Sequence, residues 1–185
     1  IVPFVSVYTA NITDANYYVP VFAYLITLAH AAYCLRLPYN IMVLAAGHYK
    51  QTQWSAIIEA SLNVVVSIVL VFQFGLIGVA IGTFVAMAYR TVYLVNYLRK
   101  NILHRKLYYF IKHVVVDACG AAILLIVVRS FPAFYAMQRI SFFAWFVLAV
   151  KVALTGMVTL LTVNCCFYRN SVKNFLVSLK RKMAL

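Results

Sequence analysis

The sequence predicts an all-α protein, a polytopic transmembrane helix bundle of about five spanning helices. Of its 185 residues, 66% are hydrophobic and only 10% are charged, whereas soluble domains are nearer half apolar and about a quarter charged. The mean hydropathy is +0.94. The apolar residues also form long runs, and a helix needs about 20 of them to cross the hydrocarbon core. A soluble fold of this size could not hide so much apolar surface from water, so we expect a lipid environment.

Five apolar runs are long enough to cross a bilayer, at residues 17–47, 54–72, 76–97, 109–128 and 140–167. The first run is longer than one crossing, since a helix rises about 1.5 Å per residue. It contains Pro38, and proline removes a backbone donor and kinks a helix. We expect one long kinked helix; the alternative is a helix that ends near Cys34 and is followed by a re-entrant segment.

The start of the chain is also apolar, and residues 1–8 are expected to be the last turns of an earlier helix. The chain begins with Ile1 and not with Met, and no signal-peptide pattern is visible. We therefore expect it to be a C-terminal fragment of a longer protein.

The charges are strongly basic, with 16 Lys and Arg against 3 Asp and Glu, a formal net charge of +13. The basic residues cluster between apolar runs, as in the cytoplasmic loops of membrane proteins. Eleven fall at position 50, in residues 99–112 and in residues 169–182, while the opposite side carries only Arg129 and Arg139. We therefore expect a cytoplasmic C-terminus, an outward-facing loop at residues 9–16, and a basic amphipathic tail on the membrane surface. No nucleic-acid partner is expected, because the basic segments match no nucleic-acid-binding motif.

No catalytic or metal-binding pattern is visible. The four cysteines lack metal-ligand spacing, and we expect them to be small buried side chains without disulfides or a bound metal; they are Cys34, Cys119, Cys165 and Cys166. Nucleophile, zinc-protease and phosphate-loop motifs are missing. We therefore expect no enzyme and no cofactor.

Polar residues inside the apolar runs are the candidate substrate-binding residues, because burying them in a membrane is costly. One stripe in the second run has members four residues apart, on one helix face: Ser55, Glu59, Asn63 and Ser67. This face either bonds to another helix or lines a watery cavity, and the spacing leaves both interpretations open.

Arg36 lies near mid-depth in the first run and shares a face with Tyr33 and Asn40. One interpretation is an ion pair with Glu59, which would need the full reach of both side chains. Another is contact with an anionic substrate, and a third is snorkelling to the interface.

Two further cations complete the candidate set. Arg90 follows three small residues on its helix face and either lines a cavity or snorkels. Lys151 lies near mid-depth; it is functional, or it is structurally paired, or its helix is shifted in the membrane. The small residues are expected to allow close helix packing: Gly78, Gly82 and Ala86. The candidate substrate-binding residues are Arg36, Asn40, Glu59, Asn63, Arg90 and Lys151.

Four short motifs follow one another between residues 35 and 103. They are Arg-x-Pro from Arg36, Gly-x-Tyr-Lys-x-Thr from Gly47, Ile-Glu-Ala-x-x-Asn from Ile58, and Phe-Gly-x-x-Gly-Val-Ala-Ile-Gly-Thr from Phe74. In this order they resemble the C-terminal region of polysaccharide-export flippases of the multidrug/oligosaccharidyl-lipid/polysaccharide (MATE-like) exporter superfamily. The resemblance covers residues 3–112, and the last two apolar runs match only in being apolar.

The resemblance implies a transporter of two helical lobes. Residues 1–97 would be the last helices of the C-terminal, second lobe, 98–113 a basic cytoplasmic loop, 109–167 two additional helices, and 168–185 a basic cytoplasmic tail. The family moves lipid-linked oligosaccharide across the bacterial cytoplasmic membrane by alternating access. The implied partners are membrane lipid, a lipid-pyrophosphate-linked oligosaccharide and the N-terminal lobe. The sequence leaves the energy source open, including whether H⁺ or Na⁺ is a coupling ion.

Other functions remain open at this stage. An ion-coupled multidrug exporter of the same superfamily would favour an acidic, aromatic cavity. A membrane-embedded polysaccharide-assembly enzyme would need a larger outer loop or a His/Asp pair, and a structural subunit would need neither.

Overall fold

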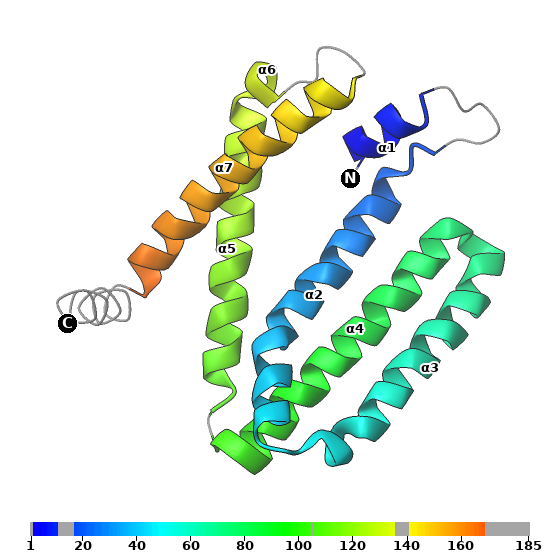
Figure 1. The fold of residues 1–185 in the computed structure, drawn as a ribbon, viewed down its shortest axis with the longest axis vertical. Coiled ribbons are helices and arrows are strands. Elements are labelled where there is room, and N and C mark those ends of the chain that lie inside the picture. Colours follow the sequence, from blue (N-terminus) through cyan, green and yellow to red (C-terminus); the bar gives the residue numbers. More distant parts are fainter. Residues whose placement is uncertain (1, 11–16, 105, 136–140, 169–185) are drawn as a thin grey trace. The chain divides into compact units, whose positions relative to one another are not determined.

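The computed structural model describes residues 2–10, 17–104, 106–135 and 141–168, and every regular element in these ranges is a helix (Figure 1). Five helices are long and apolar enough to cross a membrane. Their apolar side chains are largely exposed, Phe72 to 85%, and soluble proteins rarely leave such patches in water. The protein is therefore an all-α, multi-pass membrane protein, as the sequence predicted.

The spanning helices agree with the predicted runs within a few residues, except at the start of the second. They are α2 (Pro20–Ala45), α3 (Tyr49–Phe74), α4 (Leu76–Leu98), α5 (Tyr108–Ser130) and α7 (Phe142–Phe167); the short helices are α1 (Val2–Tyr8) and α6 (Pro132–Tyr135). Helix α3 begins five residues before the predicted start at residue 54, because its polar first turn is helical too.

Helix α2 continues without a break through Pro38. The alternative of a helix ending near Cys34, followed by a re-entrant segment, is therefore wrong. A second proline, Pro20, is the first residue of α2, where its fixed φ angle favours the helix and its missing N–H costs nothing. Inside a helix, Pro38 costs one backbone hydrogen bond, and the kink expected there stays a prediction.

The segment 98–113, predicted as a basic loop, is mostly helical. A π-helical turn, η1 (Arg99–Leu103), follows α4 directly, His104 ends it in a left-handed conformation with φ of 49°, and α5 starts at Tyr108. Lys and Arg are good helix formers, so a basic composition places this segment at the membrane edge without ending the helix. The predicted 129–139 loop likewise contains α6, which starts at Pro132.

The four cysteines are exposed rather than buried, which corrects the expectation for Cys34, Cys119, Cys165 and Cys166. Thiol side chains are apolar enough to sit on a lipid-facing helix surface. The predicted amphipathic tail at 169–185, most of the outer loop at 9–16, and the loop residues Arg105 and Arg139 lie outside the described residues.

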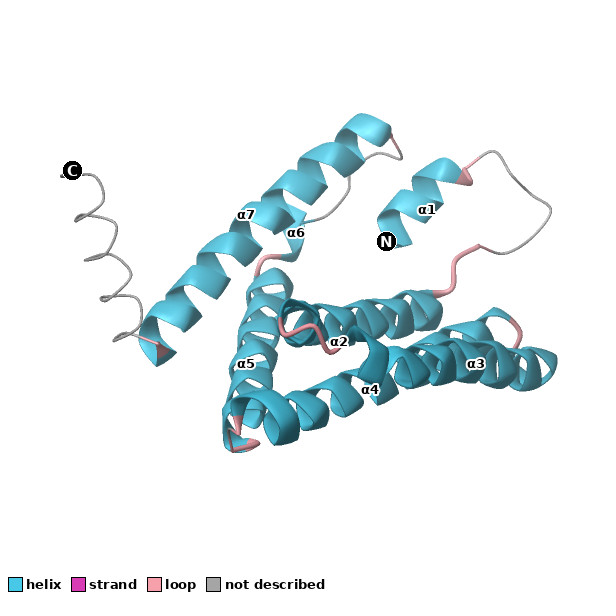
Figure 2. Cartoon of the chain, turned by 60° about the horizontal axis from the view of Figure 1, so that its bottom comes forward, coloured by secondary structure: helices cyan, strands magenta, loops and turns pink. Residues whose placement is uncertain are grey.

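The chain forms two units, Ile1–Phe110 and Ile111–Leu185. In the first unit, α4 packs along both α2 and α3, as Figures 1 and 2 both show. Near the α2–α3 turn its core consists of Val43, Leu94 and Leu98, which are 0–1% exposed. The turns that make this packing possible are tight: Gly47, with φ of 74°, follows the end of α2, and Gly75, with φ of 56°, separates α3 from α4.

Glycines let α4 approach α3 very closely. A Cβ atom on Gly78 would overlap the backbone carbonyl of Leu70, and one on Gly82 would lie 2.8 Å from the backbone nitrogen of Ser67. The small-residue face predicted from Gly78 and Gly82 is therefore confirmed as a helix contact, of the kind that drives helix association in membranes.

In the second unit, α5 and α7 meet at Gly120, where a Cβ would lie 3.3 Å from Leu160 Cδ2. Just after α7, the ring of Tyr168 stacks on His113 of α5 at 5.2 Å, and the Tyr168 hydroxyl is 2.8 Å from His113 Nδ1. Burial and the Asp117 carboxylate raise the pKa of Tyr168, so its hydroxyl keeps its proton to a higher pH than that of an ordinary tyrosine.

We expect Gly82→Ala to destabilise the protein by about 1–3 kcal/mol, because the added methyl group would press on the α3 backbone. The matched control is Gly156→Ala in α7, whose Cβ would lie at an ordinary 3.7 Å from Leu124 Cδ2. Thermal unfolding in detergent measures both variants. Equal melting temperatures would show that the α3–α4 contact tolerates a side chain.

Candidate functional site

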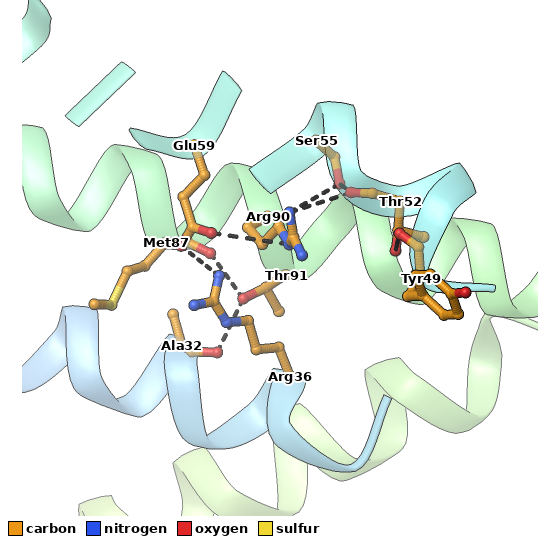
Figure 3. A network of polar contacts seen from close by, with 9 residues as sticks. All are labelled: Ala32, Arg36, Tyr49, Thr52, Ser55, Glu59, Met87, Arg90 and Thr91. Carbon is orange, nitrogen blue, oxygen red and sulfur yellow. Dashed lines mark hydrogen bonds and ion pairs between the residues drawn. The ribbon is translucent and has the colours of Figure 1, made fainter. Parts of the chain in front are cut away.

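Three charged side chains from three different helices meet inside the first unit. Arg36 of α2 donates to Glu59 of α3, with Nη1 2.5 Å from Oε1, and Arg90 Nε of α4 lies 3.8 Å from Glu59 Oε2. Figure 3 shows both guanidinium groups pointing toward the one carboxylate. The three side chains are only 12%, 20% and 11% exposed for Arg36, Glu59 and Arg90 respectively. We refer to them as the Arg36–Glu59–Arg90 cluster.

The cluster forms because Arg36 and Glu59 lie at the same depth. Arg36 is nine residues before the end of α2 at Ala45, and Glu59 is ten residues after the start of α3 at Tyr49. The pair therefore does not need the full reach of both side chains, contrary to the expectation from the sequence. The structural ion pair is the observed arrangement of Arg36, which does not snorkel.

Arg90 also bonds to α3 one turn before Glu59 and further toward the start of the helix. Its Nη1 donates to Ser55 Oγ at 3.0 Å and lies 3.4 Å from the Thr52 carbonyl oxygen. The Ser55 hydroxyl, 1% exposed as a residue, in turn donates to the Thr52 carbonyl at 2.7 Å. Arg90 thus points into the helix contact, as Figure 3 shows, and the snorkelling interpretation is wrong for it.

The cluster carries a surplus of positive charge. Arginine stays protonated in proteins and offers five N–H donors, so two guanidiniums and one carboxylate leave one net positive charge in an apolar span. A charge in this environment is costly unless it has partners. The described partners of Arg90 besides Glu59 are neutral oxygens, and Arg36 adds a cation–π contact at 5.0 Å from the ring centroid of Tyr33. Chemically, the cluster can bind an anion.

The rest of the polar stripe on α3 joins helices. Asn63 Oδ1 accepts hydrogen bonds from Thr83 of α4 and from Ser67, both at 3.3 Å. The Ser67 hydroxyl is also 3.4 Å from the Val79 carbonyl oxygen. Interhelical bonding, one of the two interpretations of the stripe, is therefore observed for Asn63 and Ser67. A role of Asn63 in substrate binding stays a prediction.

Two candidates lie apart from the cluster. Asn40 is half-buried one helical turn after Arg36, and within the described part of the chain no hydrogen bond joins it to the cluster. Lys151 belongs to the second unit, where its ammonium group is 3.3 Å from the Phe134 carbonyl oxygen and 4.4 Å from the ring centroid of Phe134. The structural pairing expected as one alternative is thus observed for Lys151, through α6.

The sequence pattern did not point to Thr91 and Thr52, which complete the polar contacts. The Thr91 hydroxyl, in a residue 5% exposed, is 2.9 Å from the Ala32 carbonyl oxygen of α2 and 2.8 Å from that of Met87. Thr52 supplies the carbonyl that Arg90 and Ser55 share. Threonine is common in transmembrane helices, so its residue type does not single out Thr91. Its position directly after Arg90 is the sequence signal that could have identified it.

Neither metal-binding clusters nor similar proteins add to this site. In the described ranges, no three His, Cys, Asp or Glu side chains gather where they could hold a metal ion. No family model, curated protein or solved structure matches the chain.

We expect Arg36 and Glu59 to be energetically coupled. Arg36→Gln or Glu59→Gln alone should destabilise the protein, because each leaves a charge with one partner fewer in an apolar span, whereas the double variant should lose less than the sum. Unfolding of the four proteins in detergent should give a coupling energy of about 1–3 kcal/mol. Arg129→Gln, at an exposed arginine in the last turn of α5, is the control. Strict additivity would contradict a direct interaction.

Proposed function

We propose that this chain is part of a membrane transporter that flips lipid-linked oligosaccharide across the bacterial cytoplasmic membrane by alternating access. The observation that carries the proposal is the surplus positive charge of the Arg36–Glu59–Arg90 cluster at mid-span. The resemblance of residues 3–112 to polysaccharide-export flippases agrees with it.

The chemistry of the substrate fits the cluster. The headgroup carries a pyrophosphate, and guanidinium groups bind phosphate oxygens with paired, charge-assisted hydrogen bonds. In the cluster, Glu59 is the resting anion, and its contact with Arg90 at 3.8 Å is looser than its contact with Arg36 at 2.5 Å. A pyrophosphate that reaches the cluster would therefore engage Arg90 first. We assign Asn63 and Ser67 to helix positioning, because interhelical contacts already occupy them.

The charge also argues against the rival functions. A multidrug exporter for cationic drugs needs an acidic cavity, but the chain has only 3 acidic residues, and Glu59 is already shared by two arginines. A polysaccharide-assembly enzyme needs a nucleophile or an acid–base pair, and no such group contacts the cluster among the described residues.

The distribution of basic residues supports a cytoplasmic C-terminus. Lys50 lies in the first turn of α3, next to the α2–α3 turn. Arg99, Lys100 and Lys106 lie between α4 and α5, and Lys112 lies near the start of α5. Positive residues are enriched on the cytoplasmic side. This orientation suits a transporter that takes its substrate from the cytoplasmic leaflet.

A labelling experiment tests the orientation. In a background without the four native cysteines, single cysteines that replace Lys50 and Lys106 should react with a membrane-impermeant maleimide only in inverted vesicles. A cysteine at Ser130, at the far end of α5, should react in intact cells. Reaction of positions 50 and 106 from opposite sides would overturn the topology.

The sharpest test of the function is Arg90→Gln in the full-length protein. This change removes the surplus charge but keeps the Arg36–Glu59 pair, so the protein should accumulate normally. Polysaccharide export should fall by about tenfold or more, since one lost charge-assisted contact is worth about 1.5–3 kcal/mol. Export is measured as surface polysaccharide per cell, with the amount of transporter measured by immunoblot.

Arg129→Gln is again the matched control, because it removes one arginine charge from a helix end without touching the cluster. Its export should equal that of the unchanged protein. If Arg90→Gln also exports at the full rate, the cluster is structural and the proposed function loses its support.

A further inference from the structure

One face of α4 and the η1 turn after it form an open groove of about 740 Å³. Pockets that bind small molecules span about 300–1,000 Å³, so the groove is large enough for a ligand. It lies within the first unit, and neither Arg36, Glu59 nor Arg90 lines it. Its lining residues include three tyrosines and, at one end, three polar side chains: Tyr89, Tyr93, Tyr97, Asn96, Lys100 and Asn101.

The tyrosines form a ladder along the groove. Neighbouring ring centroids are 6.3 Å apart between Tyr89 and Tyr93 and 6.2 Å apart between Tyr93 and Tyr97, the latter pair at an angle of 14°. The hydroxyl of Tyr97 is fixed by His48 Nδ1 at 2.9 Å. Because the ring contacts and this hydrogen bond hold the tyrosines in place, the groove has a preformed apolar wall, which lowers the entropy cost of binding.

The polar end of the groove coincides with the end of the membrane span. The apolar span of this helix runs over Leu76–Leu103, so exposed Lys100 lies at the level of the headgroups. From Lys100 back to Phe84, which also lines the groove, the helix rises roughly 24 Å at about 1.5 Å per residue. One leaflet of hydrocarbon is only about 15 Å thick. The groove is therefore polar at the interface and apolar through the depth of a lipid chain.

We propose that this groove is a binding site for an anionic phospholipid. Its phosphate contacts Lys100 and the amide of Asn96, and one acyl chain lies against the tyrosine ladder. Charge complementarity favours an anionic lipid over a covering helix. A helix of ordinary apolar composition would bury the Lys100 ammonium without a partner. An anionic headgroup pairs with this ammonium at the interface. The site shares no residue with the Arg36–Glu59–Arg90 cluster and stands independently of the proposed function.

Photolabelling of the full-length protein in lipid nanodiscs tests the site. The probe is phosphatidylglycerol with a photoreactive group on one acyl chain, and labelled peptides are mapped by mass spectrometry. Label should appear on residues 84–97 of α4. Lys100→Gln should reduce it about fivefold, the effect of about one basic residue on an anionic lipid. Lys106→Gln, which removes an exposed lysine of the same basic segment outside the groove, should leave the label unchanged.

A second variant fills the groove without removing a charge. Val92 lines it and is 62% exposed, so Val92→Trp should block labelling while the melting temperature in detergent stays the same. Three results would overturn the proposal: no label on residues 84–97, equal labelling by a phosphatidylcholine probe, or an equal loss in the Lys100 and Lys106 variants. The first would mean that another part of the protein covers the groove.

Discussion

The Glu59 carboxylate between two guanidiniums is the contact on which the arrangement of the first unit depends. An unpaired charge in hydrocarbon is costly, so α2, α3 and α4 must stay at the depth where Arg36, Glu59 and Arg90 meet. On α4, the close glycine contact at Gly82 lies two turns before Arg90, and the buried core residue Leu98 lies two turns after it. Steric packing on both sides of the cluster therefore fixes the register that the charges require.

The helices do not depend on the cluster alone for their contact. Thr83 and Asn63 join α4 to α3, and the Thr91 hydroxyl joins α4 to the Ala32 carbonyl of α2. These neutral bonds do not involve Glu59. In the proposed transporter they would hold the helices together while the cluster exchanged its carboxylate for the anion of the substrate.

The sequence predicted the helices and their polar faces, but the depth of each charge was harder to predict. Apolar runs and i, i+4 spacing identify a spanning helix and the face that carries Glu59. Hydropathy, however, placed the start of α3 at residue 54, whereas its polar first turn begins at Tyr49. This error moved Glu59 too close to the helix end and made its pairing with Arg36 look strained. The contact between Lys151 and Phe134 could not be predicted either, because Phe134 belongs to α6, a helix in a stretch whose composition indicates only a loop.

Depth in the membrane separates the cations of this chain into two chemical classes. The three cations deep inside the spans have internal partners: Glu59 for Arg36 and Arg90, and the Phe134 carbonyl and ring for Lys151. An anion that binds at this depth must displace a partner, so its binding is weakened by the free energy of the contact that it replaces. Lys100 is exposed at the end of its span, so an anion can bind to it without displacing a partner inside the helix bundle. The deep cluster is therefore suited to an anion that binds and leaves, and the interfacial lysine to a lipid that stays.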